Sequence, residues 1–257
     1  MRRLSSLQLS NILAYAGMVV VNILANLIPL GGNTTGELSD AYPNLFVPAG
    51  YVFSIWGIIY ILLLAFTVYQ ASPSRKEEEF LKKIGYLFFL SSTFNISWIF
   101  LWHYEYVILS LIPMIGLLLS LIWIYLRLDI GKSNATRDER RWIRLPFSVY
   151  LGWITVAPIA NVVAALVSIE WNGLGLSEVT WTVIVIAVAT ILTVLNSITR
   201  KDIAYSLVII WALGGIVVKQ MDIVAIVTAA GLGVTIIILF LILKLRYDFP
   251  RWLSTTN

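Results

Sequence analysis

Apolar residues fill most of the chain in long runs separated by short polar connections. A helix needs about 20 apolar residues to cross the hydrocarbon core of a membrane. By that criterion the pattern predicts eight transmembrane helices, at residues 8–30, 49–70, 84–102, 106–126, 145–168, 179–198, 203–218 and 223–243. The predicted fold class is therefore all-α, a polytopic integral membrane helical bundle. The seventh run is short, at 16 residues, so its ends are the least defined.

Composition agrees with this pattern and narrows the chemistry. Only 12% of the 257 residues are charged and 59% are hydrophobic, whereas soluble domains carry about 25% charged residues. The sequence contains no cysteine and one histidine, His103. It therefore excludes disulfides, thiol nucleophiles and both Cys-based and multi-histidine metal sites. We expect no metal centre and no catalytic histidine array.

The basic residues predict an orientation. With eight spans, every Lys and Arg except Lys219 falls on one side of the membrane, together with both chain ends. The positive-inside rule then predicts cytoplasmic N- and C-termini. This distribution explains the isoelectric point of about 9.3 without a nucleic-acid partner. We expect the lipid bilayer as the immediate surroundings and the cell (plasma) membrane as the location.

None of the eight predicted cores contains Asp, Glu, Lys, Arg or His. Ion-coupled transporters and proton relays usually place such residues inside the membrane. The pattern therefore argues against a pump or a proton-driven carrier, but less against a passive pore or a receptor. The longest outer connection, residues 31–47, carries two acidic residues and no basic one. We expect it to act as a lid over a pocket that opens outward.

The third predicted span carries a polar and aromatic stripe. Ser91, Asn95, Trp98 and Trp102 follow one another at intervals of three or four, so they share one helix face. An amide in hydrocarbon needs partners, because an unsatisfied polar group there costs several kcal/mol. Two interpretations stay open. The stripe forms one wall of a binding pocket, or Asn95 only bonds a neighbouring helix.

Two other spans carry related features. The fifth has a second intramembrane amide, Asn161, with Trp153 about two turns away, and Pro158 should kink it. The second has Trp56 and Tyr60 on one face. Such an aromatic face is more often interhelix packing or an interfacial belt than a ligand wall.

Three motifs in these spans occur together and in a fixed order. The third span reads LFFL-x4-N-x2-W, the fifth reads Y-L-x-W followed eight residues later by Asn, and the second is entered through a Pro-x-Gly loop. The residues that carry them are Pro48, Gly50, Phe53, Trp56, Tyr60, Leu87, Phe88, Phe89, Leu90, Asn95, Trp98, Tyr150, Leu151, Trp153, Ala157 and Asn161. This combination resembles the TspO/MBR family, also called translocator proteins, tryptophan-rich sensory proteins or peripheral benzodiazepine receptors.

The resemblance covers about residues 8–168 and has departures. Phe53 and Trp56 are one residue closer than usual, Pro146 is not adjacent to Tyr150, and Pro158 stands where Thr is common. Family members usually stop after five helices, whereas three more follow here, making this a long form. We therefore divide the chain into a TspO/MBR-like five-helix membrane domain at residues 1–168 and a three-helix C-terminal membrane extension at residues 169–257. The role of the extension stays open.

The resemblance implies a pocket between the first five helices that binds flat apolar ligands. The ligands expected are porphyrins (tetrapyrroles), with haem as one form, and no resident cofactor. The expected ligand-binding residues are Trp56, Tyr60, Asn95, Trp98, Tyr150, Trp153 and Asn161. Indole rings offer flat stacking faces and amides offer oriented hydrogen bonds. The family's cholesterol motif is not matched after Asn161.

Three functional classes follow from the resemblance. The first is a non-enzymatic membrane receptor or sensor for such ligands. The second is a transporter of the same ligands, and the third is a light-dependent porphyrin-degrading enzyme in which Trp56 and Trp153 match the implicated tryptophans. The sequence supplies no nucleophile and no paired acid and base, so we favour the receptor. The oligomeric state stays open, with a homodimer as one option.

Overall fold

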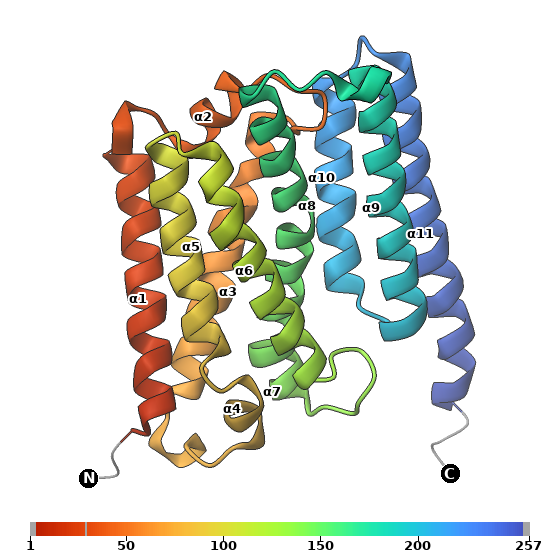
Figure 1. Ribbon diagram of the computed structural model, residues 1–257. Helices are drawn as coiled ribbons and strands as arrows, with labels where there is room; N and C mark the ends of the chain where they lie inside the picture. Colours follow the sequence, from red (N-terminus) through yellow and green to blue (C-terminus); the bar gives the residue numbers. More distant parts are fainter. Residues whose placement is uncertain (1–3, 29, 254–257) are drawn as a thin grey trace.

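The computed structural model describes residues 4–28 and 30–253, with side chains described up to Lys244. These residues form helices and short turns and contain no strand. The helices are α1 (Ser6–Leu27), η1 (Leu30–Gly32), α2 (Thr35–Ala41), η2 (Gly50–Ser54), α3 (Ile55–Gln70), η3 (Pro73–Arg75), α4 (Glu79–Ile84), α5 (Leu87–His103), α6 (Val107–Arg127), α7 (Arg137–Glu139), η4 (Arg140–Arg144), α8 (Leu145–Ser168), η5 (Gly173–Gly175), α9 (Glu178–Arg200), α10 (Ile203–Lys219) and α11 (Val224–Leu253). Figure 1 shows the long helices side by side.

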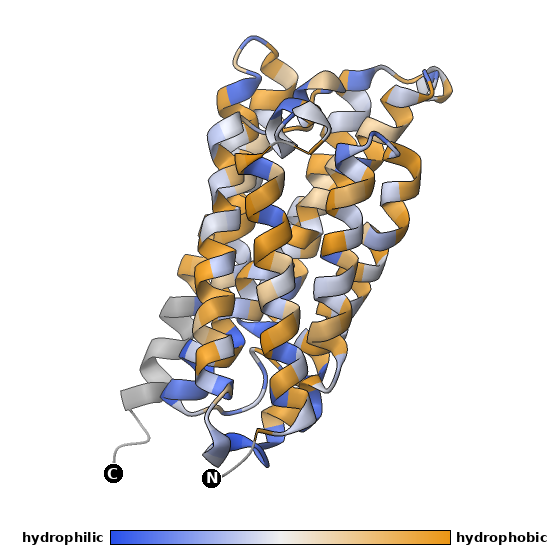
Figure 2. Ribbon diagram, turned by 90° about the vertical axis from the view of Figure 1, so that its left-hand side faces the viewer, coloured by the Kyte–Doolittle hydropathy of each residue, from blue (hydrophilic) through white to orange (hydrophobic). Residues whose placement is uncertain are grey.

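The predicted helical membrane bundle is confirmed. Within the described residues, six helices are long and apolar enough to cross a membrane. α5 and α10 have 17 residues each, at the lower limit for a membrane span. Figure 2 shows a predominantly hydrophobic middle zone between more hydrophilic ends. α1 begins and α11 ends at the same end of the bundle (Figure 1).

Several helix boundaries differ from the predicted spans. The third span was expected from Ile84, but Gly85 has φ 54° and separates α4 from α5, which begins at Leu87. A side chain at such a φ is strained, so glycine suits this break. α1 ends at Leu27, and α11 continues to Leu253. α8 continues through Pro158 as one helix of 24 residues.

The bundle has two groups of helices, and α10 on α8 is the largest contact between them. α1, α3, α5, α6 and α8 pack together as a five-helix unit, with the closest pairs being α5–α6, α6–α8 and α1–α5. α9, α10 and α11 form the C-terminal group. α10 packs closely on α8, whereas α8 and α9 touch only briefly. α10 therefore makes most of the packing contact between the C-terminal group and the five-helix unit.

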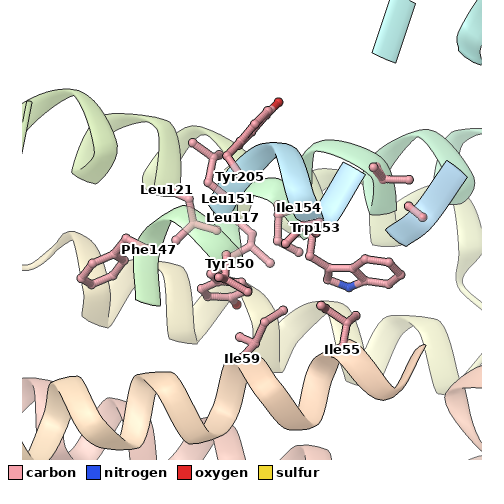
Figure 3. Close-up of a cluster of buried hydrophobic side chains, with 14 of the residues drawn as sticks. Ile55, Ile59, Leu117, Leu121, Phe147, Tyr150, Leu151, Trp153, Ile154 and Tyr205 are labelled. Carbon is pink, nitrogen blue, oxygen red and sulfur yellow. The ribbon is translucent and has the colours of Figure 1, made fainter. Parts of the chain in front are cut away.

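Small residues allow α10 to approach α8. A Cβ added to Gly152 would lie 3.0 Å from Cβ of Val208 and 3.1 Å from the carbonyl oxygen of Tyr205. On the other side of α8, Tyr150 and Trp153 face Ile59 and Ile55 of α3 in the buried core (Figure 3). α8 is therefore packed between α3 and α10.

Candidate functional site

A small cavity of about 40 Å³ lies between α3, α5, α8 and the connection from α1 to α3. We call it the tryptophan cavity, because Trp56, Trp98, Trp102 and Trp153 form much of its wall. The other lining residues are Thr35, Ser39, Pro48, Phe53, Val156, Ala157, Ala160 and Asn161. A mostly apolar wall with a few polar groups is typical of small-molecule sites.

The aromatic rings of the cavity form a continuous ladder. Trp56 stacks on Tyr60 and on Trp98, with ring centroids 5.7 and 6.1 Å apart. Trp98 in turn stacks on Trp102 at 6.1 Å. Trp153 meets Trp56 edge to face at 6.2 Å, with an angle of 81° between the ring planes. These rings come from three different helices, so the flat faces are held in place by tertiary packing.

Trp153 has the most informative polar atom in the cavity. Its side chain is 2% exposed, and its indole Nε1–H has no hydrogen-bond partner among the residues that the structure describes. Figure 3 shows the indole extending from α8 toward Ile55 of α3. A buried donor without a partner costs about 1–3 kcal/mol, and buried Trp N–H groups usually have one. A ligand with an acceptor atom would satisfy this donor.

Asn161 is the amide of the tryptophan cavity. Its Oδ1 accepts a hydrogen bond from Trp98 Nε1 at 2.7 Å, and its Nδ2 donates to Ser110 Oγ at 2.9 Å. Asn161 therefore fixes the Trp98 ring and connects α5, α6 and α8 in one buried network.

Asn95 lies in a separate network and does not line the cavity. Its Oδ1 accepts from Asn22 Nδ2 at 2.7 Å, and its Nδ2 donates to Tyr150 Oη at 3.3 Å. All three side chains are buried. The Tyr150 ring meets Trp56 at 6.1 Å. Asn95 thus ties α1, α5 and α8 together behind the aromatic ladder.

The connection from α1 to α3 covers one end of the cavity through α2, and we call residues 31–47 the lid. The carbonyl oxygen of Thr35 accepts a hydrogen bond from Trp102 Nε1 at 3.4 Å, and its hydroxyl lies 3.3 Å from His103 Nε2. Thr34 and Glu37 form a capping box at the start of α2. The hydrogen bonds from Thr34 lower the pKa of the Glu37 carboxyl, the largest contribution coming from the backbone N–H.

The C-terminal helices hold the lid and the entrance to α3. Glu178 at the start of α9 accepts from the backbone N–H of Leu45 at 2.9 Å, and Lys219 at the end of α10 pairs with Asp40 at 2.9 Å. Trp211 Nε1 donates to the carbonyl of Val52 at 3.1 Å. The C-terminal group therefore contributes to closing a cavity that lies in the five-helix unit.

The predicted site residues divide into three groups. Trp56, Trp98, Trp153 and Asn161 line the tryptophan cavity. Tyr60 and Tyr150 contact the Trp56 ring but do not line the cavity. Asn95 does not line it either, and is hydrogen-bonded to Tyr150. Thr35 and Ser39 could not be singled out from the sequence, although they lie in the connection that was expected to act as a lid. The sequence had a signal for Trp102, which follows Trp98 by one helical turn.

This fold and this cavity define a class: a multi-pass helical membrane protein with a tryptophan-lined cavity in its N-terminal five-helix unit. Over residues 8–243 the chain matches the family model described as TSPO-like protein, and it belongs to this family. The match confirms the TspO/MBR resemblance and extends past residue 168 over α9 and α10 into α11. No curated protein and no solved structure matches the chain significantly.

Proposed function

We propose that the protein is a membrane receptor or sensor that binds flat, largely apolar ligands of the porphyrin (tetrapyrrole) type in the tryptophan cavity. The observation that carries this proposal is the unpartnered, buried Nε1–H of Trp153 beside the stacked Trp56 and Trp98 rings. A tetrapyrrole offers flat π faces for the rings, and its carboxylate oxygens and unprotonated ring nitrogens are acceptors.

The cavity of about 40 Å³ is far below the range of about 300–1,000 Å³ in which drug-sized ligands are bound. Binding a tetrapyrrole therefore requires the cavity to open. The lid is the element we expect to move, because it covers the cavity with a single short helix, α2. It meets α5 through the hydrogen bonds of Thr35 and the packing of Tyr42 on Trp102. Lid displacement on binding would transmit occupancy to the outer surface, as a sensor requires.

We further propose the topology in which this site operates. All eight long helices cross the bilayer, including the 17-residue α5 and α10. Both termini are cytoplasmic in a plasma membrane. We call the end of the bundle that carries the lid the lid end, and among the described residues Lys219 is its single Lys or Arg. The positive-inside rule supports this orientation. A homodimer is compatible with the apolar residues exposed along α6 and α9.

The direct test is a titration of the full-length protein in lipid nanodiscs with metal-free protoporphyrin IX, read by tryptophan fluorescence. We expect saturable quenching. Trp153→Phe keeps a flat ring and removes the N–H, so the dissociation constant should rise about three- to tenfold, the value of one hydrogen bond. Trp123→Phe is the matched control, because Trp123 is 57% exposed on α6.

Two results would overturn this proposal. Absence of saturable quenching in the wild-type protein would contradict the proposal that the protein is a porphyrin receptor. Equal porphyrin affinity in the wild-type protein and Trp153→Phe would show that the Trp153 N–H does not donate a hydrogen bond to the ligand. Light-dependent loss of the porphyrin absorbance that Trp153→Phe abolishes would support the enzyme alternative, and accumulation of porphyrin in sealed vesicles would support the transporter.

A further inference from the structure

A second, larger cavity lies on the opposite side of α8 from the tryptophan cavity. It has a volume of about 840 Å³ and is bounded by the second half of α8, the first half of α9, the η5 turn between them and Phe46 of the lid. We call it the α8–α9 cleft. The cleft exists because α10 packs on both helices while α8 and α9 touch only briefly.

The walls of the cleft are apolar over about half the membrane thickness. On α8 they run from Pro158 to Val167 and on α9 from Glu178 to Val188. At 1.5 Å per residue each wall is about 15 Å long, half of a hydrocarbon core of about 30 Å. Val162 and Val188 are 41% and 46% exposed. The cleft therefore has the depth and lining to hold the apolar tail of a molecule from one leaflet.

The mouth of the cleft combines aromatic and acidic side chains. Trp171 and Trp181 lie there with ring centroids 5.4 Å apart. Glu170 and Glu178 also line it, and its lining contains no Lys or Arg. Glu178 accepts the backbone N–H of Leu45, whereas the Glu170 carboxylate makes no hydrogen bond or ion pair within the described part of the chain.

The acidic character extends over the whole lid end of the bundle. The described connections there carry Glu37, Asp40, Glu105, Glu170, Glu178 and Asp222. The single Lys or Arg at this end, Lys219, is paired with Asp40. The potential at the mouth therefore favours cations and disfavours anions. Tryptophan faces bind quaternary ammonium groups through cation–π contacts.

We propose that the α8–α9 cleft is a binding site for cationic amphiphiles, molecules with one ammonium group and an apolar tail. The tail occupies the wall between Val162 and Val188, and the ammonium lies at the mouth near Glu170 and the Trp171–Trp181 pair. This site is distinct from the tryptophan cavity, because different faces of α8 line the two. The lid borders both, through Phe46 at the cleft and through Thr35 and Ser39 at the tryptophan cavity.

The experiment is photo-crosslinking of the full-length protein in neutral-lipid nanodiscs with hexadecyltrimethylammonium that carries a diazirine in its chain. Labelled peptides are located by mass spectrometry. The matched probe is hexadecyl sulfate with the same diazirine. We expect the cation to label α8 and α9 along the cleft, unlabelled hexadecyltrimethylammonium to compete, and the sulfate to label this region at least fivefold less.

Variants locate the two halves of the ligand. Val162→Trp and Val188→Trp each fill the cleft from one wall and should abolish its labelling, whereas Ile191→Trp, on the exposed surface of α9, should not. Glu170→Gln should reduce labelling about two- to fivefold, the range for an exposed ion pair. Asp222→Asn removes the same charge from the same end of the bundle at a residue that does not line the cleft, and should reduce labelling less than Glu170→Gln does.

Two outcomes would overturn the proposal. Equal labelling by the cation and the sulfate would mean that the cleft holds any lipid chain and does not select charge. Labelling spread evenly over all lipid-exposed helices, unaffected by Val162→Trp and Val188→Trp, would mean that the cleft is not a site.

Discussion

The two faces of α8 line two cavities of opposite character. The tryptophan cavity has about 40 Å³, a ladder of stacked rings and a polar network that joins three helices. The α8–α9 cleft has about 840 Å³ and few cross-links between its walls. In the tryptophan cavity, buried amides and indoles bridge the helices, so the cavity is small and must open to bind a ligand. Where α10 holds two helices apart, space is already present.

The largest expected effect comes from the contact that connects α10 to the tryptophan cavity. A Cβ at Gly215 would overlap Cγ2 of Val52 and lie 3.0 Å from Cβ of Pro48, which lines the cavity. Gly215→Ala should therefore destabilise the protein by about 1–3 kcal/mol, as overpacking does. It should also weaken porphyrin binding and leave labelling of the α8–α9 cleft intact. Thermal unfolding in detergent measures the first effect.

Gly214→Ala is the matched control, because a Cβ there meets no heavy atom within 4 Å. It should leave stability unchanged or raise it by about 0.5–1 kcal/mol through the helix preference of alanine. A Gly215→Ala protein as stable as Gly214→Ala would contradict the close contact between α10 and the α3 entrance.

The second prediction separates the two buried amides. Asn161→Leu removes the acceptor of Trp98 Nε1 and one partner of Ser110, which keeps its bond to the carbonyl of Val107. Asn95→Leu removes the interhelix partner of Asn22 and of Tyr150, which keep their hydrogen bonds to Met18. Each should cost about 1–2 kcal/mol of stability. Only Asn161→Leu should also change porphyrin affinity beyond this common loss. The reverse result would show that the Asn95 network, and not the Asn161 network, supports the site.

A smaller effect is expected at the pair that joins the lid to α10. Lys219 and Asp40 are exposed enough for their ion pair to contribute at most about 1 kcal/mol. Lys219→Gln should speed porphyrin association in stopped-flow fluorescence with little change in melting temperature. Asp40→Asn should give the same acceleration, and the double variant should add nothing. High salt should remove the difference from wild type.

The smallest effect concerns the pH dependence of the lid. The folded pKa of Glu37 is lowered by the hydrogen bonds from Thr34, so the capping contribution is present above the ordinary glutamate pKa of about 4.3. It is lost as pH falls through the lowered value. The protection of the Thr34 and Glu37 amides against hydrogen exchange, relative to the intrinsic rate at each pH, should therefore fall only in that acidic window. Glu37→Gln retains a capping side chain that does not titrate and should abolish this pH dependence.

The resemblance to the TspO/MBR family, together with the helical spacing of the third span, predicted much of the tryptophan cavity. Trp56, Trp98, Trp153 and Asn161 gather there because each lies on the face of its helix that turns inward. Spacing could not tell that Asn161 lines the cavity while Asn95 bonds Asn22, since this depends on which neighbour each amide meets. For Asn95, the structure shows a bond to a neighbouring helix, one of the two interpretations that the sequence left open.

The α8–α9 cleft had no sequence signal. Its walls are runs of Val, Ile and Leu that look like any other membrane helix, and its volume depends on the position of α10. One signal for the lid was present but not used. Lys219 is the one exception to the basic distribution, and it is the residue that pairs with Asp40.

The central claim is that the buried indole N–H of Trp153 is the donor for the ligand. The most direct measurement is the indole ¹H–¹⁵N resonance of Trp153, assigned by its loss in Trp153→Phe, during a titration with metal-free protoporphyrin IX. We predict that it shifts with the same dissociation constant as the fluorescence quenching and that its hydrogen exchange slows. Saturable quenching with an unmoved Trp153 resonance would contradict the account.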